Sequence, residues 1–274
     1  MRRALVFVAI GLGFGLIVLA AMFAPQQEPV LRDTRPGKDV IYLPTDRMMV
    51  TQMLDLAVVR PSDVVVDLGS GDGRLVIAAA KRGATARGIE YNADLVDEAR
   101  RLAAFENVAD RARFDQGDIF ESDFSDATVV TMFLLPNLNL RLKPTLQAMR
   151  PGTRVVSNSF DMNDWDPDDA VNLGPDCVTA CRAFLWIIPA RAAGTWGSSQ
   201  GDELILTQKD QMLAGTFRRS GGVAVPGQGR VRGETFTFAG RGYQLTGRIA
   251  AAELNGRRRG PDGEAAFVAT RRAP

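Results

Sequence analysis

The chain has 274 residues, which is long for one ordinary domain and sufficient for two. Its 46% hydrophobic and 24% charged residues are normal for a folded protein, and its net charge at pH 7 is +1. It contains no histidine, which excludes a histidine general base, nucleophile pairs that depend on histidine, and histidine-ligated metal sites. We expect no metal site, because two cysteines alone are a poor ligand set.

The charges are distributed unevenly along the chain. Residues 194–274 contain 12 Lys and Arg against 7 Asp and Glu, whereas residues 1–193 contain 21 and 25. This asymmetry predicts two units of different composition. We interpret the basic excess as an ordinary solvated surface, and we expect no nucleic-acid partner.

An uncharged apolar run opens the chain. Residues Ala4–Ala24 follow Met1-Arg2-Arg3, and their number matches the ~20 residues that a helix needs to cross a bilayer. We therefore predict that residues 1–24 form a retained, single-pass transmembrane anchor; a cleaved signal peptide ending near Ala20 is the alternative. Residues 25–39 contain three prolines and no apolar period, so they are predicted to form a linker.

Residues 40–192 alternate strand and helix patterns. The first helix has Thr45 as a candidate N-cap and carries an apolar face, and it precedes a β-branched strand at Val64–Val66. Further helices are predicted from Leu75, at Leu95–Ala104 and at Leu138–Met149, and further strands at Gly88–Glu90, Ala112–Phe114, Ala127–Leu135, Thr153–Ser159 and Ala183–Pro189. This order predicts an α/β fold with a doubly wound, mainly parallel sheet that binds ligands at the carboxyl ends of its strands.

Residues 193–274 have a different pattern. Short alternating segments such as Glu203–Gln208 and Tyr243–Ile249 are separated by glycine-rich turns. Such segments predict a small antiparallel β domain, either a sandwich or a barrel.

A glycine-rich turn, Asp67–Gly73, follows the first strand of the α/β part. Glycines at such a turn let the backbone approach a ligand closely, and Glu90, at the end of the second strand, is an acid that can reach ribose hydroxyls. The stretch predicts a nucleoside-binding βαβ unit. The fingerprint of NAD-dependent dehydrogenases has the spacing G-x-G-x-x-G, whereas Gly69, Gly71 and Gly73 occupy every second position. The spacing therefore argues against NAD as the ligand.

This turn resembles the acid-x-G-x-G-x-G motif of class I S-adenosylmethionine-dependent methyltransferases. Glu90 falls where that family places its ribose-binding acid, and Asp118 with Ile119 falls where it contacts adenine. The resemblance implies S-adenosyl-L-methionine as the cofactor. The cofactor-binding residues that it implies are Thr45, Asp67, Gly69, Ser70, Gly71, Asp72, Gly73, Glu90, Tyr91, Asn92, Asp118 and Ile119.

Three further segments narrow the resemblance. The segments at residues 42–45, 133–139 and 151–157 are similar to the FAM173-type lysine methyltransferases and their bacterial relatives. The resemblance implies a methyl acceptor that is a protein lysine. In that group Ser-His-Asp-Phe commonly stands where this chain has Ser157-Asn158-Ser159-Phe160.

Methylation of a lysine requires an amine that has lost its proton. Asp161 and Asp164, which follow the fifth strand, are candidate proton acceptors, and Asn137 lies where related enzymes shape the acceptor slot. The alternative is that the aspartates of residues 161–169 form a solvated acidic loop.

The two cysteines, Cys177 and Cys181, are predicted to be buried and reduced, with a disulfide as the alternative in an oxidising compartment.

The sequence thus predicts a membrane-anchored methyltransferase that acts on a protein lysine, with its catalytic domain on the cytoplasmic side. Two alternatives remain: methylation of a small molecule or lipid, and a non-catalytic sensor that binds the nucleoside.

Overall fold

The structure is a computed structural model that describes residues 42–175 and 177–272. The predicted anchor and linker, residues 1–39, lie outside this described part. Within it, no helix has the length and apolar character needed to span a bilayer.

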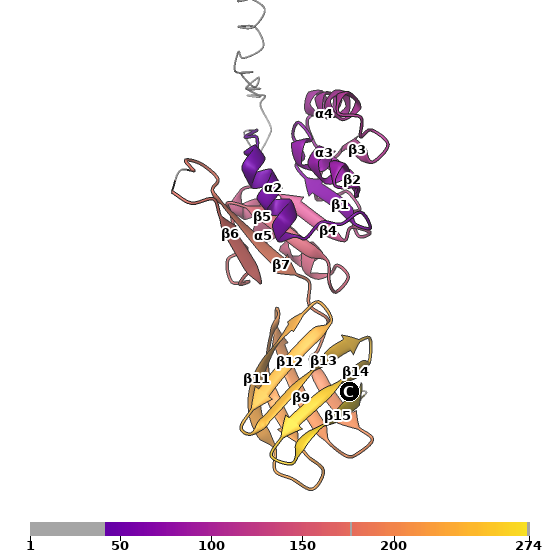
Figure 1. The fold of residues 1–274 in the computed structure, drawn as a ribbon, viewed down its shortest axis with the longest axis vertical. Coiled ribbons are helices and arrows are strands. Elements are labelled where there is room, and N and C mark those ends of the chain that lie inside the picture. Colours follow the sequence, from indigo (N-terminus) through magenta and orange to yellow (C-terminus); the bar gives the residue numbers. More distant parts are fainter. Residues whose placement is uncertain (1–41, 176, 273–274) are drawn as a thin grey trace, which may run out of the picture. The chain divides into compact units, whose positions relative to one another are not determined.

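A seven-stranded sheet in the order β3-β2-β1-β4-β5-β7-β6 forms the centre of the α/β part (Figure 1). Its strands are β1 (Val64–Leu68), β2 (Thr85–Glu90), β3 (Ala112–Gln116), β4 (Val129–Met132), β5 (Arg154–Asn158), β6 (Asp169–Asn172) and β7 (Arg182–Ile187). The first five are parallel, and β7 pairs antiparallel with both β5 and β6. The predicted α/β class and mainly parallel sheet are confirmed.

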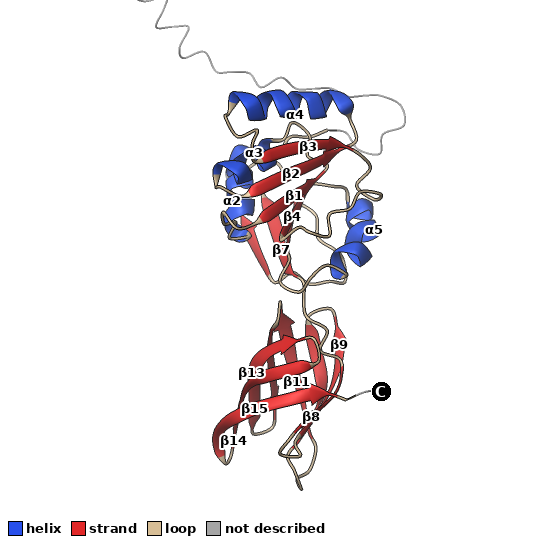
Figure 2. Ribbon diagram, turned by 90° about the vertical axis from the view of Figure 1, so that its right-hand side faces the viewer, coloured by secondary structure: helices blue, strands red, loops and turns tan. Residues whose placement is uncertain are grey.

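Helices cover both faces of this sheet. They are α2 (Arg47–Leu56), α3 (Arg74–Lys81), α4 (Ala93–Phe105) and α5 (Pro136–Gln147). Figure 2 shows α2 and α3 on one face and α5 on the other. The apolar face predicted for the first helix is confirmed, since Met49, Met53 and Leu54 are fully buried in the core. The predicted cap is wrong by one residue: the Asp46 carboxylate accepts from Met48 N at 2.7 Å, and Thr45 precedes it.

The carboxy-terminal part is a closed barrel of eight antiparallel strands. The predicted β domain is therefore confirmed, and of the two predicted architectures it is the barrel rather than the sandwich. Its strands are β8 (Gly194–Ser198), β9 (Glu203–Lys209), β10 (Met212–Arg218), β11 (Val225–Arg232), β12 (Thr235–Gly240), β13 (Tyr243–Ala250), β14 (Glu253–Gly260) and β15 (Gly263–Arg271). Trp196, Phe217, Phe236, Phe238 and Phe267 pack its interior. The barrel is therefore filled by its own side chains.

The backbone of the barrel approaches itself closely at glycines. A Cβ atom at Gly229 would lie 2.0 Å from Thr237 O, and one at Gly256 would lie 2.0 Å from Thr246 O. Only glycine permits this approach, which lets strongly bent strands close into a small barrel.

The acidic segment after β5 is not a uniformly solvated loop. The Asp168 side chain is only 1% exposed; it pairs with Arg230 of β11 at 2.6 Å and accepts from Ile187 N at 2.7 Å. Nearby, the Trp165 indole donates to Gln211 Oε1 at 2.8 Å. The loop hypothesis is therefore wrong for Asp168, and Asp169 begins the short strand β6, which the sequence pattern did not predict.

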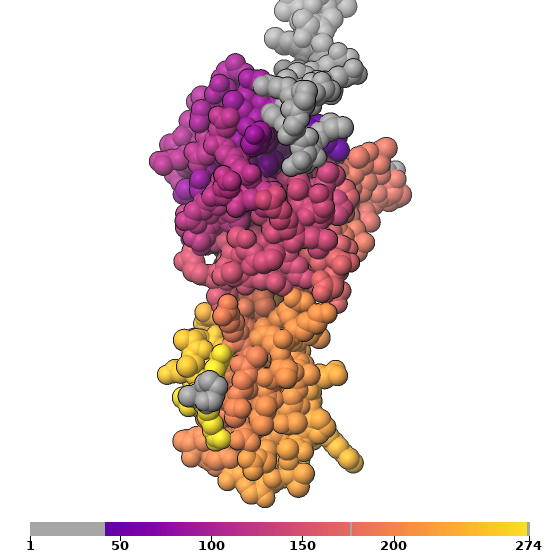
Figure 3. All heavy atoms as spheres, turned by 180° about the vertical axis from the view of Figure 1, so that it is seen from behind, coloured from indigo at the N-terminus to yellow at the C-terminus, as the bar shows by residue number. Residues whose placement is uncertain are grey.

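The hairpin between β6 and β7 contains a disulfide between Cys177 and Cys181. Both cysteines are partly exposed, so the prediction of buried, reduced thiols is wrong. Figure 3 shows the β6–β7 hairpin projecting from the surface of the α/β part.

Asp63 ties the amino ends of the central strands together. Its carboxylate pairs with the Arg154 guanidinium, and it accepts from Thr128 Oγ1 at 2.8 Å and Arg60 N at 2.7 Å. Desolvation opposes the charge, but the hydrogen bonds from Arg154, Arg60 and Thr128 outweigh it and hold the pKa of Asp63 below its ordinary value.

We expect Asp63→Asn to lower the free energy of unfolding by about 2–4 kcal/mol at pH 7, because Arg154 would lose its buried partner. The ionised Asp63 stabilises the fold above the unfolded-state pKa, and this stabilisation is lost as pH falls through the lower folded-state pKa. The difference between the proteins should therefore shrink in acid. Urea denaturation measures this, with the exposed Asp110→Asn as control; equal losses in both variants would contradict the prediction.

Candidate cofactor and acceptor site

The three alternating glycines after β1 all adopt left-handed backbone conformations. Their φ angles are 76° at Gly69, 53° at Gly71 and 80° at Gly73. Residues with a Cβ rarely adopt this region, so the turn requires glycine at these positions. At Gly73 a Cβ would also lie 2.5 Å from the Phe114 ring. The glycine spacing of the sequence is thus the direct signature of this backbone path.

Glu90 faces this turn from the end of β2. One carboxylate oxygen accepts from Gly71 N at 3.0 Å, and the other accepts from Asn92 N at 2.9 Å. An ionised carboxylate offers about four lone-pair positions, so each oxygen retains capacity for a further donor. The structure therefore brings Glu90 and the glycine turn together with a fixed carboxylate suited to ligand hydroxyls.

Asp67, on β1 just before the turn, is the buried acid of the site. Its side chain is 6% exposed, and Thr131 Oγ1 donates to it at 2.7 Å. Desolvation raises the pKa of Asp67 to about 7; the Thr131 hydrogen bond lowers it, and the charges of Glu90 and Asp72 raise it further. Asp67 is thus poised to change charge near neutral pH.

Arg74 is a residue of the site that the sequence interpretation missed. Its Nε and Nη2 atoms pair with the Asp72 carboxylate at 3.0 and 2.6 Å, and its Nη1 donates to Thr45 O at 2.7 Å. Arg74 thereby joins the segment before α2 to the glycine turn. The only signal was its position directly after Gly73.

The remaining predicted cofactor residues lie in loops at the same edge of the sheet. Asn92 is buried and caps α4 by accepting from Asp94 N at 3.0 Å, whereas Tyr91 is 61% exposed. Asp118 follows β3 and accepts from Phe120 N at 2.8 Å, with Ile119 beside it in the chain. Ser70 is buried in the turn, and its hydroxyl has no hydrogen-bond partner in the described residues. Because β1, β2 and β3 are parallel, these loops share one edge.

The three predicted catalytic residues are all exposed. Asn137 is exposed at the start of α5, and Asp161 is exposed with its carboxylate accepting from Asn163 N at 3.0 Å. Asp164 pairs with Lys143 at 2.6 Å, and the hydrogen bond and charge of Lys143 hold the pKa of Asp164 below its usual range. This pairing makes Asp164 a weak proton acceptor at neutral pH. All three assignments stay predictions.

Two buried amide side chains, Asn139 of α5 and Asn158 of β5, lie near the end of β5. Asn139 on α5 donates to Ser157 Oγ at 3.1 Å and to Phe160 O at 3.2 Å, and both Asn139 and Asn158 are fully buried. The rings of Phe133 and Phe160 stack with their centroids 6.4 Å apart. These groups provide an apolar neighbourhood with neutral polar groups after β4 and β5.

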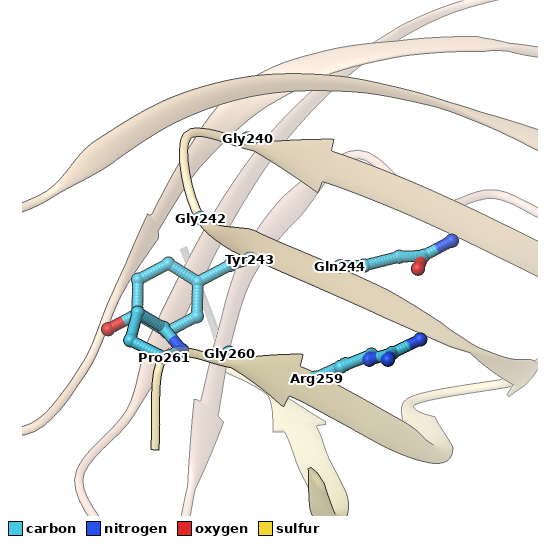
Figure 4. Close-up of a pocket in the computed structure, with 7 residues that line it drawn as sticks. All are labelled: Gly240, Gly242, Tyr243, Gln244, Arg259, Gly260 and Pro261. Atoms are coloured by element: carbon cyan, nitrogen blue, oxygen red, sulfur yellow. The ribbon is translucent and has the colours of Figure 1, made fainter. Parts of the chain in front are cut away.

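A separate open hollow lies on the barrel, lined by residues of the β12–β13 and β14–β15 turns. Figure 4 shows Tyr243 beside Pro261, while Gln244 and Arg259 extend side by side away from them. Its polar groups do not converge on one point, so we assign no site there.

Asp67→Asn tests the electrostatics of the site. Between pH 4 and 7 the folded state retains the Asp67 proton that the unfolded state has released, so the contribution of Asp67 to stability falls as pH rises to about 7. We expect the free energy of unfolding of the variant to exceed that of the native protein by roughly 2–4 kcal/mol at pH 8, and by less at pH 5. Denaturation across this range measures the gain, with the exposed Asp126→Asn as control. A gain independent of pH would contradict the raised pKa.

Comparisons with known proteins agree with this geometry. A family model described as the ANTKMT methyltransferase domain matches residues 67–169. A protein-lysine N-methyltransferase of Saccharolobus islandicus (strain REY15A) is 44% identical over 137 residues, covering 49% of this chain and 85% of that protein. The adenine nucleotide translocase lysine N-methyltransferase of Mus musculus is 35% identical over 170 residues, covering 61% of this chain and 73% of that protein.

A solved structure of an RNA methyltransferase from Salinibacter ruber is 47% identical, with a TM-score of 0.51. The match covers 54% of this chain and 95% of that one, which holds S-adenosyl-L-homocysteine, the demethylated form of the cofactor. The left-handed glycine turn and the fixed Glu90 carboxylate fit the same nucleoside. S-adenosyl-L-methionine is therefore the cofactor, and the chain belongs to the methyltransferase family that carries the ANTKMT methyltransferase domain.

Proposed function

We propose that this enzyme transfers a methyl group to the side-chain amine of a protein lysine. The main support is the 44% identity to a protein-lysine N-methyltransferase across 85% of that protein's length. The mouse relative, whose name gives adenine nucleotide translocase as its acceptor, supports the same class of acceptor. A translocase of this kind is therefore a reasonable first acceptor to test.

The strand order suggests how the cofactor lies. We place its ribose at Glu90 after β2, its adenine at Asp118 and Ile119 after β3, and its methionine part along the turn after β1. Thr45, Asp67, Gly69, Ser70, Gly71, Asp72 and Gly73 would surround the methionine part, with Tyr91 and Asn92 flanking the ribose. The proposal is supported by the contacts of Glu90 with Gly71 and Asn92, which join the two central positions.

The chemistry asks the protein mainly for alignment. S-adenosyl-L-methionine supplies a methyl group bound to a positively charged sulfur. The positive charge makes the thioether that departs a good leaving group. The protein must hold a neutral amine in line with that carbon. A lysine has a reference pKa of ~10.4, and an apolar environment such as that of Phe133 and Phe160 lowers it toward neutral pH. Asp161, Asp164 and Asn137 are the candidates that the sequence offers for assisting this step.

We also propose that residues 1–24 anchor the enzyme in a membrane through the uncharged run Ala4–Ala24, with residues 25–39 as a linker. The catalytic part is expected on the cytoplasmic side, where the methyl donor is made.

The Cys177–Cys181 disulfide favours the opposite side, because such bonds persist mainly in oxidising compartments. Thiol labelling of these cysteines in intact cells would decide between the two sides.

Transfer of isotope-labelled methyl groups to a membrane extract tests the acceptor class. We expect the label in protein, as methylated lysine after acid hydrolysis, rather than in lipid or RNA. Label in lipid or in small molecules would support the first alternative, and label in RNA would link this chain to the activity named for its Salinibacter relative. Cofactor binding without transfer to any fraction would support a sensor.

Glu90→Gln tests the cofactor assignment separately. The amide keeps the size of the side chain but replaces one acceptor oxygen with a donor that would face Gly71 N or Asn92 N. We expect affinity for S-adenosyl-L-homocysteine to fall about tenfold or more in calorimetry. The exposed Glu106→Gln on the end of α4 is the matched control and should bind normally; equal affinities in both variants would refute the assignment.

A further inference from the structure

Asn158, the last residue of β5, is a buried polar group that the cofactor turn does not use. It is fully buried, its Oδ1 accepts from Ser159 Oγ at 3.1 Å, and its Nδ2 has no partner in the described residues. An unpaired buried amide costs free energy comparable to a lost hydrogen bond. The native protein therefore keeps an unsatisfied group at this position.

The backbone beside Asn158 is also strained. Ser159 has a φ of 66°, in the left-handed region that residues with a Cβ rarely adopt, and its N–H is fixed by Arg182 O at 2.7 Å. Strain of this kind concentrates where a fold must hold a functional group in one place. The turn at Ser159 ends β5 directly after Asn158 and directs the chain to Phe160.

The sheet places Asn158 next to the expected position of the acceptor. In the order β3-β2-β1-β4-β5, a cofactor placed as proposed, with its adenine at β3 and its ribose at β2, would have its sulfur near β1 and its methyl group toward β4. Neighbouring strands are ~4.8 Å apart, and reacting atoms meet at ~3–3.5 Å, so the acceptor nitrogen falls over the end of β4. The pairing of Met132 with Ser157 puts Asn158 one residue beyond this end.

Asn158 also lies on the same face of the sheet as the segment before α2. Side chains alternate along a strand, so Asn158 shares a face with Val156 and Arg154. Val156 packs in the core formed with α2 and α3, and Arg154 Nη1 donates to Ala57 O at the end of α2 at 2.8 Å. Helix α2 therefore runs back along β5, and its beginning, near Thr45, lies toward Asn158.

We propose that Asn158 is the positioning residue for the acceptor amine, an inference that rests on the proposed lysine methylation. The Ser159 hydroxyl can donate or accept, so the Asn158 amide can turn over and present its carbonyl oxygen to an N–H of the amine. An amide is neutral and holds the amine without favouring the ammonium form as a carboxylate would. The stacked rings of Phe133 and Phe160 also favour the neutral amine, because apolar surroundings lower the pKa of an amine.

The reaction then balances without a protein base. The lysine ammonium gives its proton to water as it enters the apolar neighbourhood of Phe133 and Phe160, and the nitrogen lone pair, oriented by Asn158, faces the methyl carbon. The N–C bond forms as the C–S bond breaks, and that electron pair stays on sulfur. The product is a methylated ammonium, which releases a proton to solvent after it leaves.

Asn158→Asp and Asn158→Leu test the proposal in the full chain, with labelled cofactor and the membrane protein fraction as acceptor. The carboxylate should stabilise the ammonium and move the rising limb of kcat/KM against pH upward by about one unit or more. The leucine should lower kcat/KM about ten- to hundredfold, as expected for one buried hydrogen bond. Both variants should bind S-adenosyl-L-homocysteine normally. Asn255→Asp, the same change on an exposed position of β14, is the control.

A second measurement does not depend on turnover. Binding of n-butylamine, which mimics the end of a lysine, is followed by NMR with S-adenosyl-L-homocysteine bound. The native protein should bind it better at pH 10 than at pH 7, and Asn158→Asp should bind it at pH 7. If Asn158→Asp keeps the native pH midpoint and amine binding, the inference is wrong while lysine methylation stands. If the native protein labels no protein, the proposed function fails, and amine binding alone decides the role of Asn158.

Discussion

The hydrogen bonds of the Glu90 carboxylate with Gly71 N and Asn92 N are the interaction on which the site depends. They connect the glycine turn after β1 to the end of β2, so that two loops from neighbouring strands keep one relative position. The Glu90 carboxylate can accept from Gly71 N because the turn follows a path in which three glycines within five residues adopt left-handed conformations. Arg74 extends the same network to Thr45, and the candidate cofactor site is therefore preorganised from three separate segments.

Electrostatics change along the edge of the sheet. Around β1 and β2 the site holds the acids Asp67, Asp72 and Glu90; burial raises the pKa of Asp67, and the charges of Glu90 and Asp72 raise it further. Toward β5 the buried polar groups are neutral hydroxyls and amides, including Ser157 and Asn158. Acids suit a positively charged sulfonium cofactor, and neutral groups suit an amine that must stay unprotonated. In a chain without histidine, this division agrees with the proposal that the surroundings of the amine, rather than a dedicated base, keep it unprotonated.

The sequence was informative where backbone conformation demands a residue type. Gly69, Gly71 and Gly73 could be read directly, because left-handed conformations restrict the choice to glycine, and the buried face of α2 followed from its helical period. Long-range contacts left no such mark. Nothing in the sequence near Asp168 indicates that Arg230, 62 residues away, pairs with it, so the local pattern predicts a solvated aspartate. Likewise the pairing of β6 with β7, and the disulfide at their hairpin, depend on tertiary geometry rather than on local pattern.

The two β structures differ in their free edges. A closed barrel exposes no unpaired strand, whereas the seven-stranded sheet ends in β3 on one side and β6 on the other. Both edge strands are short and carry exposed polar side chains, among them Arg113 and Asp115 on β3 and Asp169 and Asn172 on β6. Such edges discourage a second chain from adding a strand. We therefore expect other chains to contact this protein through side chains, and under the proposed function an acceptor reaches the interior strand β4 with a long, flexible group.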